Sequence, residues 1–183
     1  MVAGPGKICP MRAIFQESDE LRIRRGSDAD LDALVAVFRE ERSFFRDCLA
    51  KQRAGGGVLL VAWLDGWPVG DVFLDRDPAE EPQIRRWLPG VPRLNHLEVL
   101  GPLQRRGIGT ALIRAGEVTA RKLGHRRIAL GVGVDNPDAR RLYERLGYTD
   151  WGHGSIIGTY QDRDHDGPPV TISETIDMLV KRL

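Results

Sequence analysis

Residues 104–124 read QRRGIGTALIRAGEVTARKLG, and this stretch decides the fold. It follows a strand-like run, Leu97–Leu100, and a Gly101-Pro102 turn. Gly124 stands where a helix C-cap glycine belongs. Between these points, apolar residues recur at helical spacing, at Ile108, Ala111, Leu112, Ala115, Val118 and Leu123. The pattern predicts a strand, then a basic turn with two glycines, then a helix.

The turn Gln104–Gly109 has the properties of an anion site. The first N–H groups of a helix lack intrahelical partners, and the helix dipole places partial positive charge beside them. Gly107 and Gly109 allow the backbone to approach an anion closely. The chain lacks the G-x-x-x-x-G-K-[ST] loop, and Leu112 stands where a dinucleotide fingerprint needs glycine or alanine. We therefore predict that this turn holds a pyrophosphate.

A second motif follows at residues 127–148. Residues 127–134, RIALGVGV, predict a strand with one branched face and one nearly bare face, formed by Ala129, Gly131 and Gly133. Another group should therefore approach the backbone on the bare face. Asn136-Pro137-Asp138 is typical of a helix start. The buried stripe of that helix is predicted at Ala139, Leu142, Tyr143 and Leu146.

Together the two motifs resemble those of the GNAT family, the GCN5-related N-acetyltransferases. Gln104–Gly109 fills every position of the family's Q/R-x-x-G-x-G/A segment, and Asn136–Tyr148 resembles its second half. The resemblance covers residues 21–183, most strongly 94–148. It implies an α/β fold with a mixed central sheet of about six to seven strands, flanked by about four helices and splayed at strands four and five. It also implies an N-acetyltransferase that uses acetyl-CoA as the acyl-donor co-substrate and needs no metal.

The resemblance assigns roles to individual residues. Val99 is expected to donate its N–H to the thioester oxyanion, and Tyr143 matches the family tyrosine that protonates the leaving thiolate. The alternative role for Tyr143 is packing within its helix. The residues expected to contact the coenzyme are Leu97, Val99, Gln104, Arg105, Arg106, Gly107, Ile108, Gly109, Thr110, Asn136, Ala139 and Tyr143.

The general base is left open. Asn95 and Arg93 occupy the positions at which family members commonly carry Glu or His, and neither is a good base at neutral pH. His96 and Glu98 lie nearby, but strict alternation turns them to the face opposite Asn95 and Leu97 unless a bulge re-aims one. Three alternatives remain: Glu98 through a water, His96 directly, or no dedicated base. Glu98 is favoured, because a carboxylate–water relay is easily accommodated.

The remaining segments fit the same plan. Residues 21–24, 27–38, 44–54, 58–64 and 69–74 predict a strand, two helices and a hairpin. Residues 75–92 read either as a solvated connection or as a wall of the acceptor pocket, in which case their acids favour a cationic amine. Strands are predicted at 155–160 and 175–183. The acidic loop from Asp162 starts like a calcium loop but has Ser173 at the twelfth position, so we predict no metal there. The aromatic residues expected in the core are Phe38, Phe44, Phe45, Trp63 and Trp67.

Length and composition limit the number of domains, the kinds of partner and the location that are expected. The 183 residues suit one domain, predicted at 21–183 after a flexible extension at 1–20. With 27 basic and 26 acidic residues, the charge balance offers no case for nucleic acid. No apolar run is long enough to span a membrane. Two distant cysteines, Cys9 and Cys48, form no disulfide framework, so a cytoplasmic location is expected.

The acceptor half is the variable half of such proteins, and three functions stay open. The first is acetylation of a small cationic amine, such as a polyamine or aminoglycoside. The second is acetylation of a protein or peptide, and the third is a coenzyme A-binding sensor without turnover. A homodimer is common on this fold, but nothing in the sequence demonstrates one.

Overall fold

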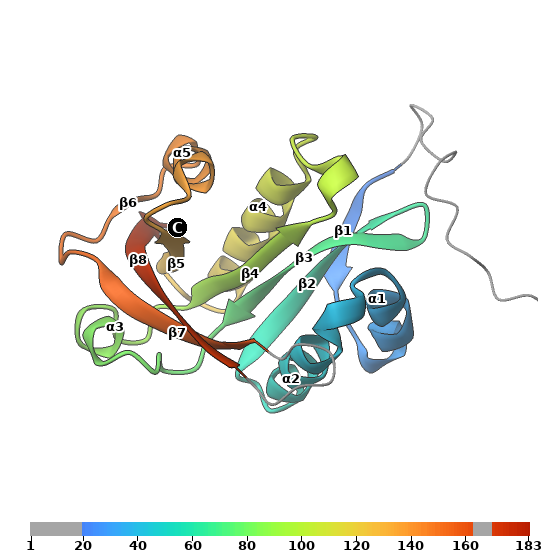
Figure 1. Cartoon of the computed structure of the whole chain (residues 1–183), viewed down its shortest axis with the longest axis horizontal. Coiled ribbons are helices and arrows are strands. Elements are labelled where there is room, and N and C mark those ends of the chain that lie inside the picture. Colours follow the sequence, from blue (N-terminus) through green and yellow to red (C-terminus); the bar gives the residue numbers. More distant parts are fainter. Residues whose placement is uncertain (1–19, 163–169) are drawn as a thin grey trace, which may run out of the picture.

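The computed structural model describes residues 20–162 and 170–183. Eight strands form one sheet in the order β1-β2-β3-β4-β5-β8-β6, and β7 pairs with β8 (Figure 1). The pairs are antiparallel except β4 with β5, which is parallel. This is the predicted mixed sheet. The predicted extension at 1–20, apart from Glu20, and residues 163–169 of the acidic loop lie outside the described residues.

The strands are β1 (Arg22–Arg25), β2 (Gly57–Leu64), β3 (Trp67–Asp75), β4 (Arg93–Val99), β5 (Arg127–Gly133), β6 (Thr149–Asp150), β7 (Ile156–Asp162) and β8 (Val170–Arg182). The α-helices are α1 (Leu31–Val37), α2 (Arg42–Arg53), α3 (Pro82–Trp87), α4 (Ile108–Lys122) and α5 (Pro137–Arg145). The eight strands and five α-helices of the described residues are close to the predicted numbers, about six to seven strands and about four helices. The elements that exceed them are the two-residue β6 and the short α3, which lies in the segment read as a connection or wall. No described helix has both the length and the apolar character that crossing a bilayer requires.

Helices cover both faces of the sheet. Alternate residues of β2 divide between two cores: Leu60 belongs to the core that α4 covers, whereas Leu59 belongs to the core that α1 and α2 cover. The short α3 covers β5 and β8 on the face that α1 and α2 share, through Ile84 and Ala129. The predicted hairpin between β2 and β3 is present, and Asp65 and Gly66 have the positive φ values, 50° and 79°, that its two-residue turn requires.

The sheet opens between β4 and β5. The two strands pair only at Arg93 with Ala129 and at Leu94 with Leu130. Beyond Leu94 they separate, so the carboxyl half of β4 has no ladder partner on its β5 side. The predicted splay is confirmed.

A bulge interrupts β4 at His96. Glu98 pairs with Asp71 and Asn95 with Phe73, so β4 carries one residue more than β3 over this interval. His96 has a φ of 53°, a conformation uncommon for a residue other than glycine. Its side chain contacts Asp71 and that of Asn95 contacts Asp75, and these two aspartates share one face of β3. Strict alternation does not hold here, and the alternative that a bulge re-aims one of the two side chains applies to His96.

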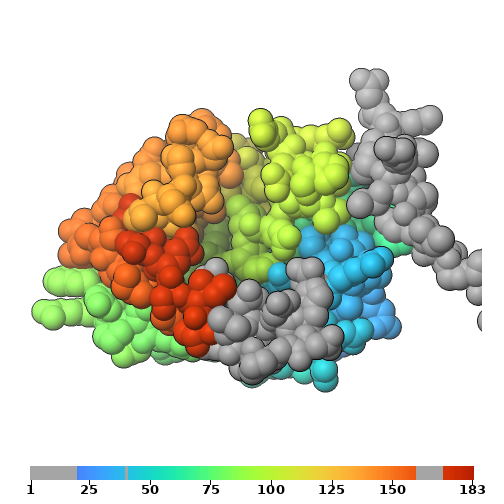
Figure 2. Space-filling view, viewed as in Figure 1, coloured from blue at the N-terminus to red at the C-terminus, as the bar shows by residue number. Residues whose placement is uncertain are grey.

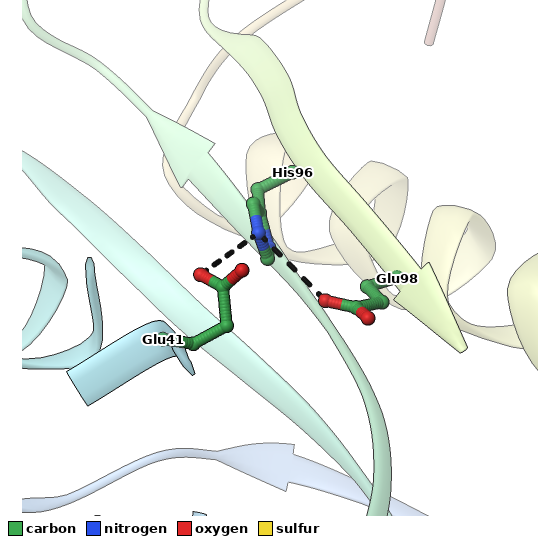
Figure 3. Close-up of side chains that lie close together, drawn as sticks. All are labelled: Glu41, His96 and Glu98. Atoms are coloured by element: carbon green, nitrogen blue, oxygen red, sulfur yellow. Dashed lines mark ion pairs between the residues drawn. The ribbon is translucent and has the colours of Figure 1, made fainter. Parts of the chain in front are cut away.

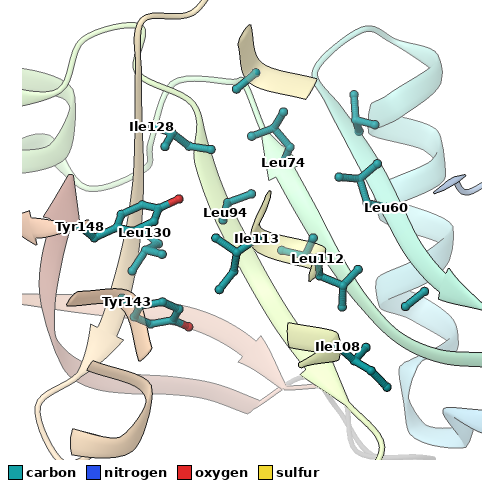
Figure 4. Close-up of a cluster of buried hydrophobic side chains, with 14 of the residues drawn as sticks. Leu60, Leu74, Leu94, Ile108, Leu112, Ile113, Ile128, Leu130, Tyr143 and Tyr148 are labelled. Carbon is teal, nitrogen blue, oxygen red and sulfur yellow. The ribbon is translucent and has the colours of Figure 1, made fainter. Parts of the chain in front are cut away.

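The middle of α4 packs closely against β4. Gly116 faces Leu94, and a Cβ at Gly116 would lie 2.6 Å from Leu94 Cδ2. Leu94 and its neighbours Leu112 and Ile113 belong to the core between sheet and helix (Figure 4). The glycine thus sets how closely the helix approaches the strand.

Gly116→Val is expected to lower the free energy of unfolding by about 1–3 kcal/mol, because the added methyl groups overpack this contact. Urea unfolding measures the change. Gly109→Ala on the same helix is the control, since its Cβ would meet nothing closer than 3.9 Å. That variant should be neutral or gain up to about 1 kcal/mol from helix propensity. Equal stability of the two variants would refute the packing argument.

Candidate active site

The basic turn lies against the end of β4, as predicted. α4 begins at Ile108, and Gly107 before it has a φ of 85°. Gln104 Nε2 donates a hydrogen bond to the Val99 carbonyl over 3.1 Å. A Cβ at Gly109 would be 3.9 Å from the side chains of both Leu97 and Val99. The free N–H groups at the start of α4 therefore adjoin the unpaired part of β4.

A cavity of about 980 Å³ opens where β4 and β5 separate. Its walls come from six strand and helix neighbours of the splay, β3, β4, β5, α2, α4 and α5, and from the Arg39–Glu41 turn, α3, β7, β8 and the segment between β3 and α3. On the surface, the molecule is hollowed between the start of α4, in yellow-green, and α5, in orange (Figure 2). Of the predicted site residues, the cavity brings together His96, Leu97 and Tyr143. The others do not line it, namely Glu98, Val99, Gln104, Arg105, Arg106, Gly107, Ile108, Gly109, Thr110, Asn136 and Ala139.

The cavity wall is acidic. Its carboxylates are Glu41, Asp47, Asp75, Glu80, Glu81 and Glu174, and its cationic side chains besides His96 are Lys51 and Arg93. Asp75 neutralises both cations in part, because it lies 2.9 Å from Lys51 Nζ and 2.9 Å from an Arg93 guanidinium nitrogen. Segment 75–92 contributes Asp75, Pro78, Glu80, Glu81 and Ile84, so it is a wall of the cavity rather than a solvated connection.

His96 is held among carboxylates at one end of the cavity. Its Nδ1 lies 3.2 Å from Asp71 Oδ1, and its Nε2 lies 3.3 Å from Glu41 Oε2 and 3.8 Å from Glu98 Oε2 (Figure 3). The imidazole stacks on Phe44 with ring centroids 3.8 Å apart. Phe44 is thus a cavity residue, whereas Phe38 and Phe45 are buried in the core as expected.

The carboxylates change the protonation of His96. Burial lowers the pKa of His96, but the hydrogen bonds and charges of Asp71 and Glu41 outweigh burial and raise that pKa to about 10. Burial raises the pKa of Asp71 to about 6, against the opposing effect of His96. The hydrogen bond with His96 lowers the pKa of Glu41, and burial raises the pKa of Glu98. His96 is therefore an imidazolium at neutral pH.

Glu41 and Asp71 are site residues that sequence reasoning missed. Glu41 ends a 3-10 turn, Arg39–Glu41, inside a charged run that carries no motif. Asp71 has a signal in the sequence: it is an acid within the mostly apolar run Val69–Leu74, and in the structure its side chain is fully buried. A buried acid is rare unless it has a partner, which here is His96.

Tyr143 lies on α5 with its side chain largely buried at the cavity wall. Its ring meets Tyr148 edge to face, with centroids 6.2 Å apart. Burial raises the pKa of Tyr143, so the phenol keeps its proton at neutral pH. A protonated phenol beside the cavity is able to donate a proton there.

Two further predictions have clear outcomes. Asn136 caps α5, because its side chain accepts a hydrogen bond from the Ala139 N–H over 3.1 Å.

Side chains of β8 approach the bare face of β5. A Cβ at Gly131 would lie 3.1 Å from Ile176 Cδ1, and one at Gly133 only 2.0 Å from Glu174 Oε1. The sequence predicted that another group approaches the backbone of β5 closely, and in the structure this group is the side chains of β8.

Comparisons with known proteins agree with this architecture. Residues 17–148, more than half of the chain, match the family described as the Acetyltransferase (GNAT) family. An uncharacterised N-acetyltransferase of Methanocaldococcus jannaschii is 33% identical over 107 residues, which cover 58% of this chain and 44% of that protein. The chain thus spans less than half the length of this curated relative.

Solved structures share the fold. An acetyltransferase of the GNAT family from Streptococcus pneumoniae superposes with a TM-score of 0.62 at 22% identity, over 90% of this chain and 100% of that one. The PaiA N-acetyltransferase of Thermoplasma acidophilum, solved in complex with coenzyme A, gives 0.62 at 18% identity, over 90% and 99%. On the family match, together with the splayed sheet and the glycine turn, the chain belongs to the GNAT acetyltransferase family.

Proposed function

We propose that the chain is an acetyl-CoA-dependent N-acetyltransferase that acetylates the primary amine of a small cationic molecule by direct attack in a ternary complex. The observation that carries this proposal is the acid-lined cavity that opens at the splay of β4 and β5. Six carboxylates outnumber the His96 imidazolium and the two partly neutralised cations, Lys51 and Arg93, and this excess favours a positively charged acceptor.

The proposed coenzyme path follows the turn and the strand. The pyrophosphate lies on the N–H groups of Gly107–Thr110, with Arg105 and Arg106 beside it. The pantetheine arm runs along Leu97–Val99 in the splay. Support for Val99 as the oxyanion donor comes from its neighbour: the Leu100 N–H donates to Val69 of β3 over 3.0 Å. Successive N–H groups of a strand point to opposite sides, so that of Val99 points away from β3, into the opening.

The proposed chemistry uses two cavity side chains. His96 takes a proton from the acceptor ammonium, and the neutral amine then attacks the thioester carbonyl. Tyr143 protonates the leaving thiolate, a role that its retained phenolic proton supports. His96 is preferred to Glu98 as the base because His96 lines the cavity, with Glu98 beside its Nε2.

Diamines and polyamines are expected to be acetylated with kcat/KM at least about tenfold higher than monoamines of equal chain length, because a second ammonium meets the acidic wall. The advantage should shrink as ionic strength rises, since salt screens the wall. Free-thiol release from acetyl-CoA measures both effects.

The same panel contains aminoglycosides, free amino acids, and peptides with a free N-terminus or lysine. A preference for peptides would replace the small-molecule acceptor with a protein acceptor and leave acetyl transfer intact. Equal rates for monoamines and diamines at all salt concentrations would remove the electrostatic argument for the acceptor.

A further inference from the structure

The Asp71–His96–Glu41–Glu98 cluster contains more negative charge than one imidazolium balances. Three carboxylates surround one ring: Asp71 at Nδ1, and Glu41 and Glu98 at Nε2. They come from three different elements, β3, the Arg39–Glu41 turn and β4 itself. The net negative charge of the cluster therefore favours the binding of an additional cation.

An ammonium held between Glu41 and Glu98 must lie close to His96 Nε2. The two glutamate oxygens are 3.3 and 3.8 Å from that nitrogen, so a group that bonds to both enters the same space. The imidazolium proton already occupies this space with its own positive charge. Two cations at such a distance repel each other, and an imidazolium is intrinsically a stronger acid than a primary ammonium, so the Nε2 proton is the one that leaves.

We propose that Glu41 and Glu98 bind the acceptor ammonium and that its arrival displaces the Nε2 proton of His96, so that the base is generated only when the acceptor is bound. The inference rests on the proposed function and specifies the acceptor end of the same site. It makes Glu41 and Glu98 substrate-binding residues and Asp71 a positioning residue.

Asp71 and Phe44 hold the imidazole ring of His96 in the orientation that this proton exchange requires. The buried Asp71 carboxylate accepts a hydrogen bond from the Nδ1–H of the imidazolium, which leaves Nε2 as the nitrogen that titrates. Phe44 stacks on the ring and fixes its plane. The other charged groups of α2 that line this cavity are Asp47 and Lys51. Because the carboxylates hold the proton of His96 well above neutral pH, the exchange is visible under ordinary assay conditions.

The protons balance over the cycle. Acceptor binding sends one proton from Nε2 to solvent. Neutral His96 then takes one proton from the ammonium, the amine nitrogen forms the C–N bond, and the C–S bond breaks. The second nitrogen proton leaves as the amide forms, while Tyr143 supplies the thiol proton and is reprotonated from solvent. The sum is one ammonium and acetyl-CoA giving one amide, coenzyme A and one proton.

Calorimetric titration tests the exchange. 1,4-Diaminobutane is titrated into the full chain with coenzyme A at pH 8, in phosphate and in Tris, whose different ionisation enthalpies reveal proton release. Wild type should release about one proton per bound amine, and His96→Gln about none. Glu41→Gln should bind at least about tenfold more weakly. All buffers contain EDTA, because three ligand-type atoms within 4.8 Å of one another can also bind a stray divalent cation.

Two controls keep the outcome interpretable. Asp32→Asn removes an exposed acid outside the cavity and should leave affinity and proton release unchanged. Asp71→Asn keeps the side-chain shape, lowers the pKa of His96 and should reduce proton release at pH 8. Every variant must unfold at the wild-type temperature within the error of the scan.

Thiol release is measured on the same wild-type protein, and this separates the two claims. Turnover without proton release would overturn the proton exchange and leave acetyl transfer standing. Proton release without turnover on any amine would support the exchange and overturn acetyl transfer. Absence of both binding and turnover for all amines would overturn both.

Discussion

Replacing Gly109 with glutamate is expected to weaken acetyl-CoA binding at least about 100-fold while the protein stays folded. Gly109 is in the first turn of α4, where the pyrophosphate is proposed to lie. A glutamate there would satisfy the free N–H groups itself and repel the phosphates. An acid in the first turn suits the helix dipole, and a Cβ at this position meets nothing closer than 3.9 Å, so the fold should tolerate it.

Calorimetric titration with acetyl-CoA measures the loss, and thermal unfolding checks the fold. Gly109→Ala should bind within about threefold of wild type, because its Cβ fits and adds no charge. Arg114→Glu changes the charge on an exposed position of the same helix and should have a small effect. Undiminished binding by a folded Gly109→Glu protein would contradict the proposed pyrophosphate site.

Tyr143→Phe is expected to lower kcat by about 100- to 10,000-fold, with little change in acetyl-CoA affinity. The substitution removes only the hydroxyl, so the ring retains its packing in the core with Leu130 (Figure 4). The leaving thiolate would then lack its proton donor. Steady-state kinetics with the best amine, together with coenzyme titration, separate the two parameters.

Tyr148→Phe is the matched control for this prediction. Tyr148 meets the Tyr143 ring but does not line the cavity. Its variant should retain kcat within about threefold, so a large loss there would indicate damage to packing. A Tyr143→Phe enzyme with the wild-type kcat would show that another group protonates the thiolate.

The parts of the fold that sequence reasoning reached are those encoded by short-range patterns. The glycines and the 3.6-residue period of 104–124 fixed the turn and α4, because capping and helical periodicity depend on neighbours in the chain. The alternation of 127–134 and the Asn-Pro start predicted β5 and α5 in the same way. The splay came from the family resemblance and not from any local pattern.

What sequence reasoning missed depends on contacts between distant segments. Glu41 and Asp71 join His96 only because β3, β4 and the turn before α2 meet in space. The bulge at His96 has no short-range signature, since it is the pairing register of β3 with β4 that creates it. Strand β8 covers the glycine face of β5 from more than forty residues away along the chain, so periodicity within β5 could not identify it.

Thiol release from acetyl-CoA in the presence and absence of an amine tests the central claim most directly. The same samples report coenzyme binding by thermal shift. The account predicts that acetyl-CoA stabilises the protein and that a diamine then accelerates thiol release, with the acetylated amine formed in equal amount. Stabilisation without thiol release for any amine would contradict acetyl transfer, and absence of both would contradict the assignment of Gln104–Gly109 as the coenzyme site.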